Sequence, residues 1–132
     1  MFLLDTDVLI WILRGRKELK DKVSKLKEES PLAISVISIA EIFRNIFPSE
    51  LSTTEDFLDL HVIFDVDRKT AKIAGLYCQH YQPQLKNLSL EDCLIAATAN
   101  VNNVTLVSLN TKHFPMNDIK LINPLRSTKT AG

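Results

Sequence analysis

Four acidic side chains stand at positions where a folded chain could use them for chemistry. Asp5 and Asp7 lie two residues apart after the apolar run MFLL, and a second apolar run follows them. Glu41 and Asp92 each lie in the first turns of a strongly apolar helical pattern. Carboxylates that gather repel one another, so burying several together is costly unless a cation offsets their charge. Oxygen ligands suit Mg²⁺ or Mn²⁺ rather than zinc, and the three histidines show no zinc-ligand spacing.

Each of these acids also has a purely structural explanation. Residues 38–41 read SIAE and residues 89–92 read SLED, and both match the capping box that begins a helix. An aspartate in a first helical turn, such as Asp5 or Asp7, complements the helix dipole. Taken singly, capping explains each acid at least as well as chemistry does. The prediction of a site therefore depends on whether the fold brings the acids together.

The apolar pattern predicts an α/β fold. Short, uniformly apolar segments alternate with helical patterns, which is typical of a parallel sheet covered by helices on both faces. The predicted strands are residues 2–4, 32–35, 61–66, 105–109 and 119–122. The predicted helices are residues 7–15, 16–29, 38–47, 53–60, 67–80 and 89–100. We expect one domain, residues 1–125, followed by a flexible tail, residues 126–132.

Such a sheet gives the scattered acids a common place. In an open parallel sheet, ligands bind beyond the carboxyl ends of the strands. Asp5 follows the first predicted strand and Asn110 follows the fourth. Glu41 lies on the helix after the second strand, and Asp92 lies on the helix that leads into the fourth. All four side chains can therefore converge on one edge of the sheet.

Composition limits the class of protein. The 16 basic and 16 acidic residues cancel, so no overall field indicates a polyanionic partner. Residues 14–27 nevertheless hold seven basic and two acidic residues, which fits either a solvated helix face or contact with a phosphate backbone. Cys78 and Cys93 lie in apolar helical patterns, where we expect reduced thiols. No stretch is long enough to span a membrane, and we expect a soluble cytoplasmic protein.

The chain resembles the PIN-domain ribonucleases and, among them, the VapC-like toxins of toxin–antitoxin pairs. The likeness spans residues 2–125, and four segments carry it in the family's order: LLDTDVLI, ISVISIAEI, LSLEDCLIAATA and TLVSLNTKHF. Each segment is weakly specific, but the four together are strongly so. The resemblance implies a PIN-like parallel sheet of five short strands in the order 3-2-1-4-5, with helices on both faces.

The resemblance also assigns roles to particular residues. It places catalytic residues at Asp5, Glu41, Asp92 and Asn110, with Asp5 and Asp92 as metal ligands. The fourth position is an acid in many PIN domains, so Asp118 is an alternative to Asn110. Supporting polar residues are expected at Thr6, Asp7, Ser38 and Ser108, the last standing where threonine is usual. Candidate RNA-contacting residues are Arg14, Arg16, Lys17 and Lys112.

The activity implied by the resemblance is hydrolysis of RNA phosphodiester bonds by water activated by Mg²⁺ or Mn²⁺, leaving 5′-phosphate and 3′-hydroxyl ends. It also implies a homodimer and a small antitoxin whose C-terminal segment blocks the cleft. Trp11, Phe43 and Phe47 are candidates for an interface, although filling the core explains them equally well.

Two other interpretations compete with this one. Asp5 and Asp7 match the two acids of the D-x-D-x-[TV] motif of haloacid-dehalogenase-like phosphotransferases, and Ser35 could serve as their phosphate-binding hydroxyl. The third element of that family, GD-x-x-x-D, is absent from the sequence. The other interpretation is a PIN domain that binds RNA or protein without cutting, or a scaffold whose acids are all caps.

Overall fold

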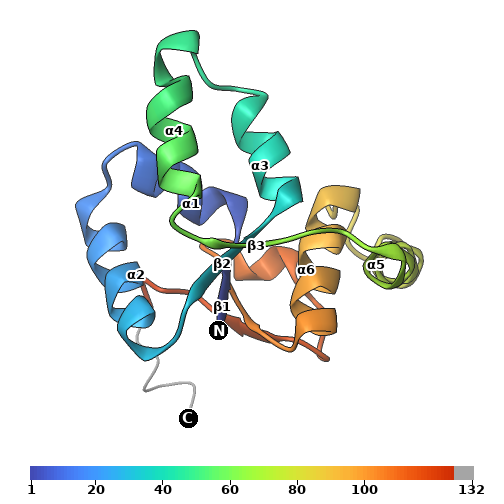
Figure 1. The fold of residues 1–132 in the computed structure, drawn as a ribbon. Coiled ribbons are helices and arrows are strands. Elements are labelled where there is room, and N and C mark those ends of the chain that lie inside the picture. The colour runs from blue at the N-terminus through green and yellow to red at the C-terminus, as the bar shows by residue number, and fades with distance from the viewer. Residues whose placement is uncertain (127–132) are drawn as a thin grey trace.

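The centre of the molecule is a five-stranded sheet in which all neighbouring strands run parallel (Figure 1). The computed structural model describes residues 1–126. The strands are β1 (Phe2–Leu4), β2 (Leu32–Ser35), β3 (Val62–Phe64), β4 (Thr105–Val107) and β5 (Lys120–Ile122). Their order, β3-β2-β1-β4-β5, confirms the expected order.

Helices cover both faces of this sheet, as predicted. They are α1 (Thr6–Leu13), α2 (Lys17–Glu29), α3 (Val36–Phe43), α4 (Leu51–Leu58), α5 (Arg68–Tyr81) and α6 (Leu90–Asn102). Two short 3₁₀ turns are η1 (Pro48–Glu50) and η2 (Thr111–His113). Figure 1 shows α2 and α5 on opposite sides of the sheet, while α3 and α4 extend beyond its edge and are joined by the loop that contains η1.

The central strands β1, β2 and β4 are mostly apolar and buried, as expected for a sheet covered on both faces, whereas the edge strands β3 and β5 are partly exposed. Leu3 packs into a core cluster with residues of α5 and α6, whereas its neighbour Leu4 packs into a second cluster with residues of α1 and α2. Both leucines are fully buried. Since β1 lies between β2 and β4, whatever follows β1 is held at the middle of the carboxyl edge.

Polar side chains cap the helices that leave this edge. The N-cap residues with a side-chain hydrogen bond are Asp5 for α1, Ser35 for α3, Asp67 for α5 and Ser89 for α6. At the other end of α1, Gly15 has a φ of +86°, a left-handed conformation that a β-carbon would strain. The turn at Gly15 therefore ends the helix, in agreement with the predicted range of residues 7–15.

The helix predicted over residues 38–47 begins and ends earlier than expected. It begins at Val36 because the Ser35 hydroxyl accepts a hydrogen bond from the Ile37 N–H, so the predicted capping box at residues 38–41 is wrong. It ends at Phe43, and Phe47 has the extended backbone that a residue before proline favours.

The helix predicted over residues 53–60 also begins earlier than expected. Thr53 and Thr54 lie inside α4, which begins at Leu51 and continues directly from η1. Thr54 is buried. Proline at the start of η1 supplies the fixed φ that begins a helical turn, so the chain needs no hydroxyl cap there.

Three smaller observations complete the description of residues 1–126. Cys78 and the buried Cys93 are free thiols, as predicted. No helix among these residues combines the length and the apolar character needed to span a membrane. Apart from Arg126, the predicted tail lies outside the described residues.

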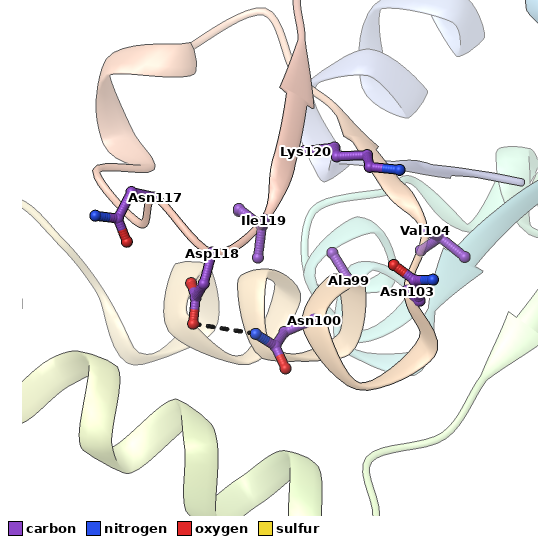
Figure 2. A pocket seen from close by; sticks show the side chains of 8 residues that line it. All are labelled: Ala99, Asn100, Asn103, Val104, Asn117, Asp118, Ile119 and Lys120. Carbon is purple, nitrogen blue, oxygen red and sulfur yellow. Dashed lines mark hydrogen bonds between the residues drawn. The ribbon is translucent and has the colours of Figure 1, made fainter.

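The amino edge of the sheet carries a polar network of its own. Asp118, just before β5, accepts hydrogen bonds from the Tyr77 hydroxyl (2.8 Å) and from Nδ2 of Asn100 (3.1 Å). These residues tie α5 and α6 to the turn that precedes β5. A hollow of about 250 Å³ lies beside them, and Figure 2 shows Asn100 pointing to Asp118 across it.

Replacing Tyr77 by phenylalanine should lower the free energy of unfolding by about 1–2 kcal/mol. Asp118 loses a donor, and Nδ2 of Asn100, which also donates to the Tyr77 hydroxyl (3.1 Å), loses an acceptor. Urea denaturation measures this change. Asn117→Ala is the matched control, since Asn117 lines the same hollow and makes no side-chain hydrogen bond among residues 1–126. Equal stability of Tyr77→Phe and the native protein would contradict a structural role for the network.

Candidate active site

Asp5 lies at the middle of the carboxyl edge and is held there by hydrogen bonds to three neighbours. Its backbone N–H donates to the Val107 carbonyl of β4 (2.9 Å). Its Oδ1 accepts from the Thr6 N–H (2.8 Å), and its Oδ2 accepts from the Ser108 hydroxyl (2.8 Å). The Ser108 hydroxyl in turn accepts from the Asn110 N–H (3.0 Å). The buried carboxyl therefore joins the ends of β1 and β4.

A chain of hydroxyl groups connects α1 to α3. The Thr6 hydroxyl donates to Oε1 of Glu41 (2.6 Å) and lies 2.8 Å from the Ser38 hydroxyl. Because the one proton of Thr6 goes to Glu41, Ser38 must be the donor in the second hydrogen bond. Ser38 is completely buried. The motif S-x-x-E at residues 38–41 thus serves a contact with α1 instead of a helix cap.

Asp92 lies in the first turn of α6 and does form the predicted capping box. Its backbone N–H donates to the Ser89 hydroxyl (3.0 Å), and its Oδ2 accepts from the Ser89 N–H (3.3 Å). The same Oδ2 lies 3.8 Å from Nδ1 of His113, on the turn after β4. Sequence reasoning missed His113 as a neighbour of the site, although it lies within the segment TLVSLNTKHF that carries the resemblance.

The two candidates for the fourth position lie at opposite edges of the sheet. Asn110 follows β4 at the carboxyl edge, where its side chain is exposed and makes no hydrogen bond within the described part of the chain. Asp118 precedes β5 at the amino edge and is bonded to Tyr77 and Asn100. Asp118 is therefore not the fourth residue of this site. Lys112, also exposed, lies on η2 near Asn110.

The candidate RNA-contacting residues lie where α1 joins α2. Arg14, Arg16 and Lys17 are exposed there. Trp11 and Phe47 do not fill the core, since 42% and 72% of their surfaces are exposed, whereas Phe43 is half-buried. Within residues 1–126, no acidic side chain of α2 forms an ion pair.

The pKa values show that the carboxylates share one field. Burial, followed by repulsion from Asp7, raises the pKa of Asp5 to about 8. Burial likewise raises the pKa of Asp7 and that of Glu41. Repulsion from Asp92 adds to the upward shift of the pKa in all three. The fold thus gathers four carboxyls that cannot all carry charge at neutral pH without compensation.

The chemistry of this cluster fits a hard divalent cation. Oδ1 of Asp7 is buried and has no hydrogen-bond partner, which is costly for a carboxylate oxygen. A cation would both satisfy this oxygen and offset the repulsion. No three acidic, histidine or cysteine side chains of residues 1–126 are placed to hold an ion by themselves. Mg²⁺ fits such a site because it keeps several water ligands.

A family model described as PIN domain matches residues 2–118. The match covers most of the 132 residues and includes the ends of β1 and of its two neighbours, β2 and β4. The chain belongs to the PIN-domain family. This membership excludes the haloacid-dehalogenase-like interpretation, and the Ser35 hydroxyl that it required caps α3 instead.

Individual relatives lie among the VapC proteins. Ribonuclease VapC10 of Mycobacterium tuberculosis is 36% identical over 116 residues, which cover 88% of this chain and 87% of that protein. A chain of a toxin–antitoxin complex from Klebsiella pneumoniae has a TM-score of 0.76 at 26% identity, over 96% of this chain and 100% of that one. A chain of the DNA-bound VapBC2 complex of Rickettsia felis, at 23% identity, supports the fold with a TM-score of 0.79 over 92% and 97% of the two chains.

In the absence of divalent cations, the protein should lose stability as the pH rises between 3.8, the ordinary pKa of an aspartate, and about 8. In this window the folded protein keeps a proton on Asp5 that the unfolded chain releases, so the free energy of unfolding falls with rising pH. Thermal melting in EDTA should show a decrease of several degrees, which Mg²⁺ reverses at pH 8.

Asp5→Asn supplies the control, because an amide is neutral throughout this range. Its melting temperature should depend less on pH than that of the native protein. Asp118→Asn, at the other edge of the sheet, should keep the native dependence. Parallel curves for Asp5→Asn and the native protein would contradict the assignment of the raised pKa to Asp5.

Proposed function

We propose that the chain is a Mg²⁺- or Mn²⁺-dependent endoribonuclease that acts as the toxin of a toxin–antitoxin pair. The observation that carries this proposal is the cluster of four carboxyls at one edge of the sheet. Burial and mutual repulsion raise the pKa of Asp5, Asp7 and Glu41, and Oδ1 of Asp7 has no hydrogen-bond partner. Membership in the PIN-domain family and similarity to a protein named ribonuclease VapC10 support RNA as the substrate.

The cation-binding residues in this proposal are Asp5 and Asp92, with the free oxygen of Asp7 beside them. Glu41 lies farther out and would contribute through water, since its Oε1 already accepts from Thr6. A bound Mg²⁺ or Mn²⁺ ion would lower the pKa of the attacking water and would offset the negative charge of the transition state. Hydrolysis at this site leaves a 5′-phosphate and a 3′-hydroxyl.

The surrounding residues keep the carboxyls in place. Ser108 and the Thr6 N–H fix both oxygens of Asp5, so the carboxyl cannot rotate away from the ion. Ser38 and Thr6 orient Glu41 in the same manner. Asn110 is free to hold a water or a substrate oxygen, because its side chain is exposed next to Ser108. Because these side chains are already in place, they need not rearrange during the reaction step.

Single-stranded or looped RNA is the proposed substrate, because its backbone can approach a recessed acidic site that a duplex cannot enter. Arg14, Arg16 and Lys17 would bind phosphates on one side, and Lys112 would do so from the turn after β4. The specific alternative is a PIN domain that binds RNA without cutting it, which an activity assay separates from a nuclease.

Purified protein should cleave single-stranded RNA in Mg²⁺ or Mn²⁺ and lose this activity in EDTA. Asp5→Asn and Asp92→Asn should each lower kcat by more than about a hundredfold, which is the upper end of what is lost when a group merely supports a metal ligand. Asp118→Asn is the matched control and should cleave at the native rate. Full activity of both site variants, with native folds by circular dichroism, would contradict the proposed site.

We further propose a homodimer and a small antitoxin that covers the cleft. The toxin–antitoxin complexes among the similar structures support this partner, and the exposed Phe47 and Leu51 beside η1 offer apolar surface for a protein contact. Light scattering after size exclusion should give twice the chain mass of 14.9 kDa. A monomer at micromolar concentration would contradict the homodimer. Adding the product of an adjacent short reading frame should increase the mass further and stop RNA cleavage.

A further inference from the structure

The single tryptophan of the chain lies on the surface beside two arginines. Trp11 is on α1, and 42% of its surface is exposed. The guanidinium carbon of Arg14 lies 5.7 Å from the centre of its ring, and that of Arg16 lies 5.8 Å away. Both distances are within the range of a cation–π interaction. An exposed aromatic ring is thus paired with two cationic side chains that are exposed and lie outside the core.

Neither arginine has an acidic partner within residues 1–126. The one side-chain ion pair there joins His113 and Asp92, on another part of the molecule. The adjoining α2 adds further positive charge, since residues 14–27 contain seven basic and two acidic residues. Two guanidinium groups held beside a ring and not neutralised favour a partner that brings negative charge.

The position of this group relative to the acidic cluster is fixed by α1. Residues 7, 11 and 14 are spaced by four and three, so Asp7, Trp11 and Arg14 lie on one face of the helix. Four residues of α-helix rise by about 6 Å, which places Trp11 one turn beyond Asp7. A short stretch of single-stranded RNA can therefore contact both Asp7 and Trp11.

We propose that Trp11, Arg14 and Arg16 bind a nucleotide of the RNA substrate close to the bond that is cut, with its base stacked on the indole and its phosphate on the guanidinium groups. This inference rests on the proposed ribonuclease function. Aromatic rings beside basic side chains bind single strands with little sequence preference, because every base has a stacking face. A contact with an apolar protein surface is disfavoured here, since it would desolvate two arginines without supplying negative charge.

The single tryptophan makes the proposal directly measurable. The probe is a mixed-sequence, single-stranded RNA oligonucleotide with a fluorescent label at its 3′ end, added to the Asp5→Asn variant in EDTA. Label anisotropy reports binding, and tryptophan emission reports contact with Trp11 alone. We expect emission to be quenched along the same binding curve as the anisotropy. An abasic oligonucleotide of equal length should bind more weakly and leave the emission unchanged.

Substitution tests the strength of the contact. Trp11→Ala should weaken RNA binding on the order of tenfold to a hundredfold, the range expected for loss of one stacked base. Trp11→Phe, which keeps a ring, should retain most of the affinity. Leu76→Ala is the matched control, because Leu76 is also an exposed apolar residue (54%) but lies on α5, on the opposite side of the sheet. Circular dichroism verifies that each variant is folded.

Three results would overturn the proposal: binding without quenching, unchanged affinity of Trp11→Ala, or no RNA binding at all. A change of oligomeric mass in Trp11→Ala with unchanged RNA affinity would identify a subunit contact and overturn it too. The ribonuclease function is judged separately, by Mg²⁺-dependent cleavage with the native protein. Mg²⁺-dependent cleavage that Trp11→Ala does not affect would support the ribonuclease function and contradict only the proposed contact between Trp11 and the RNA.

Discussion

Repulsion among the carboxyl groups at one edge of the sheet is the constraint on which the rest of the structure depends. Asp5 and Asp7 are held side by side at the start of α1, and Glu41 and Asp92 reach the same field from α3 and α6. A chain selected only for stability would not retain this arrangement, because each buried charge makes the next one more costly. The cost becomes understandable when a divalent cation completes the cluster.

The fold makes this cluster possible by bringing strand ends and helix starts to one place. Asp5 caps α1 and Asp92 lies in the first turn of α6, so both carboxyls lie near the positive ends of helix dipoles. Hydrogen bonds from Ser108 and Thr6 then fix the carboxyl of Asp5, and one from the Ser89 N–H fixes that of Asp92. Capping and chemistry are therefore compatible roles for the same side chain, since Asp5 and Asp92 both cap a helix and both belong to the carboxyl cluster.

Local patterns in the sequence predicted what depends on local structure. The five parallel strands, the Gly15 stop and the capping box at residues 89–92 all follow from short-range rules. The motif at residues 38–41 satisfied the same rule and yet is no cap, because Ser35 begins the helix earlier and Ser38 bonds to Thr6 from another element. No local rule identifies a contact between residues that are distant in the chain.

The features that the sequence did not predict also depend on contacts between residues that are distant in the chain. His113 reaches Asp92 from a turn more than twenty residues along the chain. Asp118 lies before β5, which agrees with the strand predicted over residues 119–122, but its hydrogen bonds to Tyr77 and Asn100 join residues that no local pattern connects. The pairing of Trp11 with two arginines across the end of α1 also depends on how the chain turns at Gly15. Family resemblance supplied candidate residues for the site, whereas the tertiary contacts decided which of them lie together.

Isothermal titration of Mn²⁺ into the metal-free protein at pH 7, in buffers of different ionisation enthalpy, tests the central claim most directly. Because the pKa of Asp5 is raised to about 8, binding of the ion should release a proton and the measured heat should depend on the buffer. Asp5→Asn should bind weakly and without proton release. Buffer-independent heat, or equal binding by Asp5→Asn, would contradict the account.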